Sequence, residues 1–427
     1  MSEAATRKLH YAWVIAGVTF VIMLIISGVR ATPGLFMVPL ETEFGWSRAI
    51  ISASIAVNIA LFGLIGPFAA SVMERWGLRR VVLGALALMT TAVATSTRMS
   101  SEWQFFLLWG VLVGAATGVT AMVLAAVVAT RWFDQRRSLV LGMLSAANAT
   151  GQMIFLPQLA SVTESSNWRS AALIVAAAAA IVFALVWFVM RDRPADVGLK
   201  PYGFDPAAPV STARPLSPIA ALSAASRTRA FWILAGTFFI CGASTNGLIG
   251  THLISACHDV GITPLRSTQL LAMMGLFDIL GTTASGWLTD RYSARHLLFA
   301  YYTLRGLSLL FLPATLLEGG MSLGIFAVFY GLDWIATVPP TVKLTTEAFG
   351  KENTGVVYGW IGASHQLGAS MAAFGAGAIR TGTGDYRLAF LIAGALCLVA
   401  GASFILLGRK TLGPQSLDRP LPAPVVA

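Results

Sequence analysis

The dominant pattern along this chain is a series of long apolar stretches separated by short polar segments. An apolar helix of about 20 residues crosses the roughly 30 Å hydrocarbon core of a bilayer at about 1.5 Å per residue. Twelve stretches come close to this length or exceed it, at approximately 12–38, 49–72, 80–97, 103–130, 139–160, 170–190, 230–256, 268–289, 297–317, 321–345, 355–379 and 387–408. The pattern predicts an all-α integral membrane protein with twelve transmembrane helices.

Internal repetition divides this pattern into two halves. A charged phrase between two apolar stretches contains Ala70, Glu74, Arg75, Gly77, Arg79 and Arg80. It returns about 216 residues later as Gly286, Asp290, Arg291, Ser293, Arg295 and His296. The segment at 139–151 likewise matches the segment at 356–368, so that Asn148 corresponds to His365. We expect two pseudo-symmetric six-helix halves.

The boundary between the halves is a polar segment that contains Pro194, Pro201, Pro206, Pro209, Pro215 and Pro218. This composition is typical of a flexible or polyproline-like tether, which would leave the halves free to rock. The predicted organisation is a first half at 1–190, a linker at 191–229, a second half at 230–408 and a tail at 409–427.

Composition and charge support a membrane protein and exclude other classes. Hydrophobic residues make up 56% of the chain and charged residues 11%, against roughly 25% charged in soluble domains. Twenty of the 29 Lys and Arg residues fall at the termini and in the loops on the same side, which predicts cytoplasmic termini. Because these basic residues are dispersed over short loops, the net charge of +10 does not indicate nucleic acid as a partner.

The chain carries no enzyme signature that we recognise. It has no HExxH motif, no GxSxG motif and no spacing of His and Cys that suits a metal. We expect neither catalysis nor a metal nor an organic cofactor. The expected partners are the lipid bilayer and a small molecule, and we expect the monomer to be the functional unit.

The charged phrase resembles the signature G-x-x-x-D-R-x-G-x-R-R of the major facilitator superfamily, with Ala70 and Glu74 as departures and Ser293 as a departure in the echo. The segment RWFDQRRSLVLGMLSAANATG resembles the helix 5 motif of the monocarboxylate transporter family, less closely. These resemblances imply a multi-pass transporter of the bacterial inner membrane, moving a small organic solute by alternating access between the two halves.

The loop residues have two readings. Their charges could form ion pairs with neighbouring helix ends and hold one gate shut, with Gly77 supplying a tight turn of positive φ. Alternatively, they only set topology and anchor the protein at the headgroups. The residues concerned are Glu74, Arg75, Gly77, Arg79, Arg80, Asp290, Arg291 and Arg295.

Charged residues inside the apolar stretches are the first candidates for function, because an ionisable group at the bilayer centre costs on the order of 3 kcal/mol. Arg30 lies in a stretch whose Gly and Pro residues loosen the helix, and it is a candidate for binding an anion. Alternatively, it pairs with a buried carboxylate or extends towards the headgroups.

Asp278, Arg305 and Asp333 stand at similar depths, within one or two turns of the midplane. We expect a structural ion pair of Arg305 with Asp333. The remaining carboxylate would then titrate, since burial favours the neutral form of a carboxyl group. The resemblance favours Asp278, which matches the proton-linked Asp of the monocarboxylate transporter motif D-x-x-x-R-x-x-x-G. Thr282 occupies the Arg position, so the carboxylate clamp of that family is missing.

Other residues complete the predicted site. His252, together with Asp278 and Asp333, is a candidate for proton coupling, although a lone His on an apolar helix is more often a core residue. The predicted substrate-binding residues are Arg30, Thr282, Asn148, Tyr330, His365 and Trp360.

Two substrate classes remain open. A monocarboxylate or related organic anion, taken up with a proton, is favoured by Arg30, Asp278 and the helix 5 motif. A neutral or weakly ionised planar compound, such as a vitamin of the riboflavin type, is favoured by Thr282 and the aromatic residues.

Overall fold

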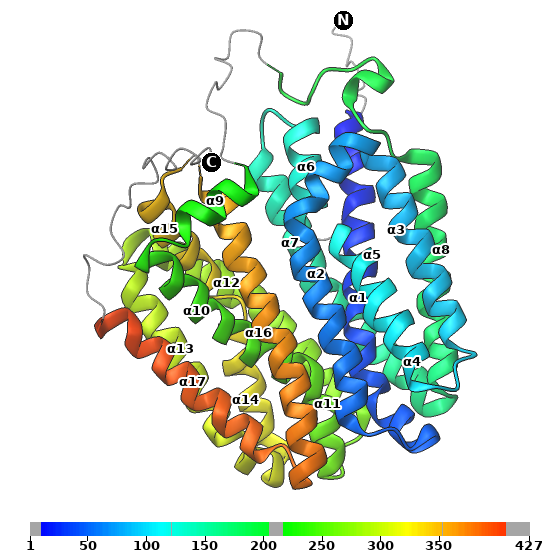
Figure 1. Ribbon diagram of the computed structural model, residues 1–427, viewed down its shortest axis with the longest axis vertical. Helices are drawn as coiled ribbons and strands as arrows, with labels where there is room; N and C mark the ends of the chain where they lie inside the picture. Colours follow the sequence, from blue (N-terminus) through cyan, green and yellow to red (C-terminus); the bar gives the residue numbers. More distant parts are fainter. Residues whose placement is uncertain (1–9, 121, 205–216, 352, 407–427) are drawn as a thin grey trace, which may run out of the picture.

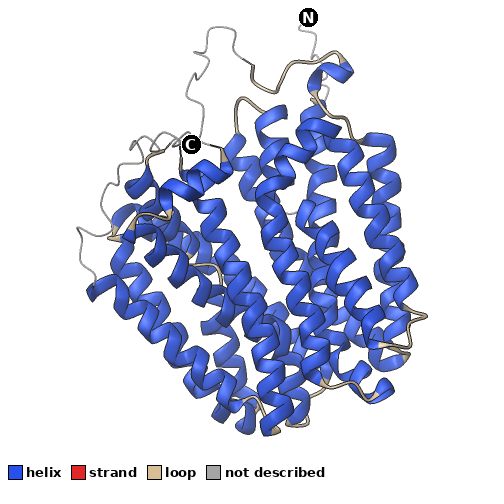
Figure 2. Cartoon of the chain, in the orientation of Figure 1, coloured by secondary structure: helices blue, strands red, loops and turns tan. Residues whose placement is uncertain are grey.

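Helices joined by short loops form the structure (Figure 2). The structure is a computed structural model that describes residues 10–120, 122–204, 217–351 and 353–406. The predicted tail at 409–427 lies outside these ranges. Among the described residues the one β-type contact is an isolated bridge between Phe133 and Tyr202.

The first half contains eight α-helices and one π-helical segment. They are α1 (Tyr11–Phe44), α2 (Arg48–Trp76), α3 (Leu78–Ser96), α4 (Glu102–Phe105), η1 (Phe106–Val113), α5 (Gly114–Val119), α6 (Met122–Trp132), α7 (Arg137–Ser165) and α8 (Trp168–Val189). The linker carries the short helices η2 (Pro194–Val197) and α9 (Pro218–Ala225). The second half contains α10 (Arg229–Gly242), η3 (Ala243–Ile249), α11 (Gly250–Asp259), α12 (Pro264–Arg291), α13 (Ala294–Glu318), α14 (Gly320–Asp333), α15 (Val338–Phe349), α16 (Thr354–Thr383) and α17 (Arg387–Leu406).

These elements confirm the membrane fold predicted from the sequence. Ten helical segments among the described residues are long and apolar enough to cross a bilayer. They include three composite segments, in which α4 to α6, α10 to α11 and α14 to α15 each form one crossing. The remaining two predicted crossings are α7 and α16, which are 29 and 30 residues long and richer in Gly, Ser and amide side chains.

The helices form two bundles that lie side by side (Figure 1). We call the end of the molecule where α1 begins and α17 ends the terminal face, and the opposite end the distal face. Helix α9 of the linker lies at the terminal face (Figure 1). Between the bundles, α2 packs against α16, α7 against α12, and α1 against α11.

The second half contains an interrupted helix. There, α14 ends at Asp333 and α15 begins at Val338. A break in a transmembrane helix is typical of transporter folds, because backbone groups freed at the break can line a site.

Small residues set the close contacts between helices. Gly110, Gly114 and Gly118 face α2, and a Cβ atom at Gly114 would lie 2.8 Å from the Cα atom of Asn58. Gly368 of α16 approaches the backbone of Phe239 on α10 in the same way. Backbones approach this closely in membranes because helix association depends on van der Waals packing.

Each described end of the linker is hydrogen-bonded to the half next to it, and the flexible tether stays a prediction for the residues between these ends. The backbone N–H of Tyr202 donates to the carbonyl of Trp132 at 2.8 Å, and its carbonyl accepts from Asp134 at 2.9 Å. At the other end of the linker, the indole of Trp360 donates to the carbonyl of Pro218 at 2.8 Å. Each half therefore holds the linker segment next to it, and residues 205–216 lie outside the described ranges.

A glycine substitution tests the packing of the second half. In Gly281→Ala the new methyl group would overlap the carbonyl oxygen of Leu332 on α14, so we expect a destabilisation of about 1–3 kcal/mol. The measurement is the thermal unfolding temperature of the purified protein in detergent, which should fall by several degrees. Gly286→Ala on the same helix is the control, since nothing lies within 4 Å of its Cβ position. Equal melting temperatures for both variants would contradict this packing.

Candidate functional site

The two halves are joined at the distal face by a network of charged side chains. Arg48, at the start of α2, donates two hydrogen bonds to the carboxylate of Asp259 at the end of α11, at 2.7 and 2.9 Å. Glu41 also accepts from Arg48, at 2.8 Å, and Arg380 donates to Asp259 at 2.6 Å. Tyr386 lies beside Arg48, with 3.4 Å between its hydroxyl and a guanidinium nitrogen. We call these five residues the distal latch.

Burial strengthens the latch, because Arg48 is only 4% exposed and a two-pronged guanidinium–carboxylate contact fixes both geometry and orientation. His252 contacts the latch through Tyr386. Its Nε2 donates to the carbonyl of Ala373 at 2.7 Å, which leaves Nδ1 to accept from the Tyr386 hydroxyl at 3.1 Å. His252 is therefore a fully hydrogen-bonded core residue beside the latch in this state, apart from the two carboxylates with which the sequence grouped it.

Other contacts close the same face. The backbone N–H of Ala49 donates to the hydroxyl of Thr381 at 3.2 Å, and the N–H of Leu265 donates to Glu164 at 2.8 Å. A Cβ atom at Gly34 of α1 would lie 3.0 Å from a backbone oxygen of α11. The hydrogen bonds that join the two halves within the described residues all lie towards the distal ends of their helices, so the molecule is closed on that side.

A second cluster of charges lies inside the second half, where α14 is interrupted. Arg305 of α13 donates through Nε to Asp333 at 2.6 Å and through Nη1 to the sulfur of Cys241 at 2.9 Å. Its Nη2 donates to the backbone carbonyls of Asp333 and Trp334. Arg305 is 1% exposed. It thus forms the expected ion pair with Asp333 and also binds the carbonyls freed at the break.

The other residues of this cluster lie on α12. Asp278, which is 4% exposed, accepts from the backbone N–H of Ile335 and from the hydroxyl of Thr282, both at 2.9 Å. Ser285 donates to the carbonyl of Ala336 at 2.6 Å. Side chains of α12 and α13 therefore satisfy the backbone groups that the interruption leaves free. We call Asp278, Arg305 and Asp333 the helix-break cluster.

The helix-break cluster holds two carboxylates and one guanidinium. No ion pair within the described residues includes Asp278, and the Oδ1 atom of Asp333 is buried without a hydrogen-bond partner. With both carboxylates ionised, the cluster would carry one uncompensated negative charge in a medium of low polarity. Uptake of one proton removes this charge.

Arg30 stands apart from these networks. It lies near the middle of α1, which continues unbroken through Pro33, so the loosening expected there from Gly and Pro does not occur. Its Nε atom is buried without a hydrogen-bond partner, and no carboxylate in the described chain pairs with it. The guanidinium carbon lies 3.5 Å from the centre of the Phe62 ring on α2. Among the described residues the Phe62 ring is the contact found for this guanidinium, so its charge is available to bind an anion.

The position of Arg30 places it at the boundary between the halves. It lies one helical turn from Gly34, where α1 meets α11. Phe62 precedes Gly63, whose Cβ position meets the side chain of Gln366 on α16. The Oε1 atom of Gln366 is also buried without a partner. Arg30 and Gln366 thus each carry a buried polar atom without a hydrogen-bond partner, close to the interface of the two bundles.

Several predicted substrate-binding residues have other partners. The hydroxyl of Tyr330 donates to the carbonyl of Ser244 at 2.8 Å, and this side chain is 1% exposed. The indole of Trp360 holds the linker, as described above. The hydroxyl of Thr282 donates to Asp278. In this state the polar atoms of these three residues have partners within the protein, and their contact with substrate stays a prediction.

The two residues related by the repeat differ in what the structure says of them. The ring of His365 packs at 4.8 Å from the ring of Phe238 within the second half, and the His365 backbone closes against Gly242. It therefore faces α10. The side chain of Asn148 lies outside what the structure describes.

The repeated loops contact their own halves. Gly77 has φ of 89°, as expected, and a Cβ there would lie 2.9 Å from the carboxylate of Asp192. That carboxylate accepts from the N–H of Arg79 at 2.7 Å, and the Arg79 guanidinium donates to the Trp187 carbonyl. No ion pair in the described chain includes Glu74, Arg75 or Arg80.

In the echo, Arg291 donates to the carbonyl of Trp287 at 3.1 Å and Arg295 to that of Phe404 at 2.7 Å, whereas Asp290 is exposed. The loop charges therefore close no gate between the halves in this state. The closed gate is instead the distal latch, which we did not predict. Its residues come from helix ends 211 and 121 positions apart in the sequence, so no local motif reveals it.

Comparison with known proteins agrees with this architecture. A sequence model of the Major Facilitator Superfamily matches residues 18–373 and 258–427. The chain belongs to the major facilitator superfamily. It is 24% identical to an uncharacterized MFS-type transporter, YcxA, of Bacillus subtilis, over 91% of this chain and 92% of the relative. It is 27% identical to monocarboxylate transporter 13 of Rattus norvegicus, over 97% and 96%.

A solved structure of the superfamily has the same fold. A bacterial homologue of the human lysosomal transporter Spinster, in an inward-facing and occupied conformation, superposes with a TM-score of 0.73. The match covers 93% of this chain and 97% of that one at 14% identity. The chain is thus a multi-pass membrane transporter of this superfamily and not an enzyme.

The distal latch gives a test of how this superfamily member closes. Asp259→Asn removes one charge from a largely buried pair, a change that typically costs about 3–5 kcal/mol, so the distal face should open more often. Cysteines placed at Ala49 and Thr381 report closure through their rate of oxidative cross-linking, identified by peptide mass spectrometry. We expect at least a tenfold slower rate in Asp259→Asn.

Asp134→Asn is the matched control. It breaks the more exposed ion pair of Asp134 with Arg137 on the terminal face, where both side chains are at least 33% exposed. The cross-linking rate should not change in this variant. An unchanged rate in Asp259→Asn would show that the latch does not hold the distal face shut.

Proposed function

We propose that this transporter takes up a monocarboxylate or related organic anion together with a proton. The observation that carries the proposal is Arg30, a guanidinium near the middle of α1 with a buried, unpartnered Nε and no carboxylate partner in the described chain. A buried cation of this kind is costly unless a counterion binds it for part of the working cycle. An anionic substrate supplies that counterion.

The relatives of this chain support the same class of substrate. Several relatives are named monocarboxylate transporters, including monocarboxylate transporter 11 of Homo sapiens at 27% identity over 95% of this chain. In this chain Thr282 stands where the motif of that family has its Arg, and its hydroxyl is bound to Asp278. Arg30 would therefore take over the carboxylate, with the amide of Gln366 as a second polar contact.

The helix-break cluster is the proposed proton site. It combines two carboxylates with one guanidinium, and the second negative charge lacks an ion-pair partner among the described residues. Asp278 is the favoured carrier, because Asp333 already pairs with Arg305 at 2.6 Å. When Asp278 takes up a proton, the hydrogen bond from Ile335 at the break weakens, since a neutral carboxyl is a poorer acceptor.

The proposed setting is the bacterial inner membrane, with the terminal face in the cytoplasm. The excess of Lys and Arg at the termini and in the loops on that side supports this orientation. Closure of the distal latch then corresponds to a carrier shut towards the outside.

The substrate class can be tested by binding. We expect at least one acid in a panel of acetate, pyruvate, benzoate and nicotinate to raise the melting temperature of the purified protein, while its uncharged amide does not. In Arg30→Gln this stabilisation should disappear, and in Arg30→Lys it should be reduced, because Lys keeps the charge but loses the planar fork.

Two further arms keep the test decisive. The unliganded melting temperatures of both Arg30 variants show whether the fold is intact. Riboflavin represents the neutral planar class. Stabilisation by riboflavin that persists in Arg30→Gln, with no response to any acid, would overturn the anion proposal.

Proton coupling can be tested in proteoliposomes. With the acid selected by the binding panel, an inward proton gradient should drive uphill uptake, and Asp278→Asn should abolish accumulation. Exchange of labelled for unlabelled acid should survive, because Asn can still accept from Ile335 and Thr282. Asp290→Asn, an exposed position on the same helix, is the control. Accumulation that persists in Asp278→Asn would exclude Asp278 as the coupling residue.

A further inference from the structure

A groove of about 600 Å³ opens between α2, α3 and α5 of the first half. Its walls are formed almost entirely by small and aliphatic residues, namely Ile65, Val72, Val81, Gly84, Ala85, Leu88, Ala115, Ala116 and Val119. At its terminal-face end the lining changes to Arg75, Trp76 and Arg80. The groove is therefore apolar along its length and positively charged at one mouth.

The two guanidinium groups at this mouth have no charged partner. Both Arg75 and Arg80 are exposed, and no ion pair within the described residues includes either one. Arg79 of the same loop differs, since it is bound to the Trp187 carbonyl. Trp76 is 61% exposed beside them, as is typical of an indole at a membrane–water interface. The mouth thus combines two uncommitted cations with an interfacial aromatic ring.

The length of the groove matches one leaflet of a bilayer. From Arg75 to Ile65 is ten residues of helix α2, or about 15 Å at 1.5 Å per residue. Half of the hydrocarbon core is also about 15 Å. With the arginines at headgroup level, the inner end of the groove reaches the depth at which an acyl chain ends.

We propose that this groove binds an anionic phospholipid, with its phosphate between Arg75 and Arg80 and one acyl chain along the wall of α2, α3 and α5. Charge complementarity favours an anionic headgroup, because basic residues near the membrane surface attract anionic lipids. The apolar wall favours a lipid over soluble phosphate, because an acyl chain can cover this wall and inorganic phosphate cannot. This site is separate from Arg30 and the helix-break cluster.

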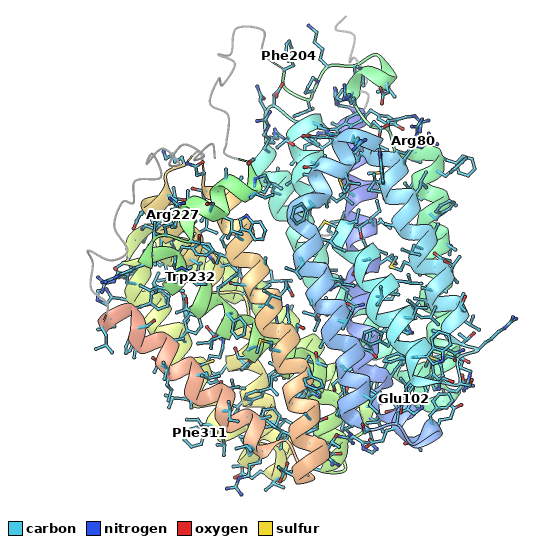
Figure 3. All side chains as sticks on the ribbon, viewed as in Figure 1. Arg80, Glu102, Phe204, Arg227, Trp232 and Phe311 are labelled. Atoms are coloured by element: carbon cyan, nitrogen blue, oxygen red, sulfur yellow. The ribbon has the colours of Figure 1, made fainter. Side chains whose placement is uncertain are left out.

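The experiment is a titration of the purified full-length protein, followed by native mass spectrometry. The probes are phosphatidylglycerol and phosphatidylcholine with identical acyl chains, and inorganic phosphate. We expect the wild type to bind phosphatidylglycerol at least tenfold more tightly than phosphatidylcholine. In Arg75→Gln/Arg80→Gln this preference should fall at least tenfold. The control Arg227→Gln/Arg229→Gln removes two exposed cations where the linker meets α10, and it should change the preference less than twofold. Figure 3 labels Arg227.

A second variant tests the acyl wall independently of charge. Gly84 is exposed on α3 and lines the groove, and nothing lies within 4 Å of its Cβ position, so we expect the side chain of Gly84→Leu to occupy the groove. We expect its lipid-free melting temperature to be equal to or above that of the wild type, because Leu favours helix over Gly. Its affinity for phosphatidylglycerol should nevertheless fall at least tenfold.

Four results would overturn the proposal. One is equal affinity of the wild type for the two lipids, and another is an unchanged preference in the double Arg variant. The third is competition by millimolar inorganic phosphate that abolishes phosphatidylglycerol binding, which would assign the arginines to a soluble anion. Unchanged binding in Gly84→Leu would place the lipid outside the groove.

Discussion

The constraint on which this structure depends is that every backbone polar group inside a bilayer needs a partner within the protein. A continuous helix meets it automatically, but the interruption between α14 and α15 does not. Arg305, Asp278 and Ser285 supply the missing partners, and each reaches the break from a neighbouring helix. The charges that the proposed proton site uses are thus the same groups that make an interrupted helix tolerable in lipid.

The two charged networks divide structural and chemical tasks between them. The distal latch joins the halves through contacts that must break whenever that side opens, and two of its members, Glu41 and Arg380, remain partly exposed. The helix-break cluster lies wholly within one half, so it can move as a unit while the halves rock. A rearrangement of rigid bundles is expected on this basis, with the charge state of the cluster as one variable that biases it.

The repeat, the twelve crossings and the Arg305–Asp333 pair could be predicted from the sequence, since apolar length, self-similarity and equal depth are one-dimensional signals. The latch could not, because Arg48 and Asp259 meet only when the halves do. Burial of a Tyr330 or Trp360 side chain also looks the same in sequence whether its polar atom meets substrate or a carbonyl. Gln366 could not be predicted either, because a neutral amide beside His365 gives no signal in the sequence. Only the structure shows that its oxygen is buried without a partner.

The interior charges have an electrical consequence. Arg30 and Arg305 carry two positive charges, and Asp278 and Asp333 carry two negative ones, so the empty carrier is balanced across this set. If one organic anion binds Arg30 and one proton binds Asp278, the loaded carrier is balanced as well. Neither form would then gain or lose energy from a voltage across the bilayer, and the pH difference alone would drive the cycle.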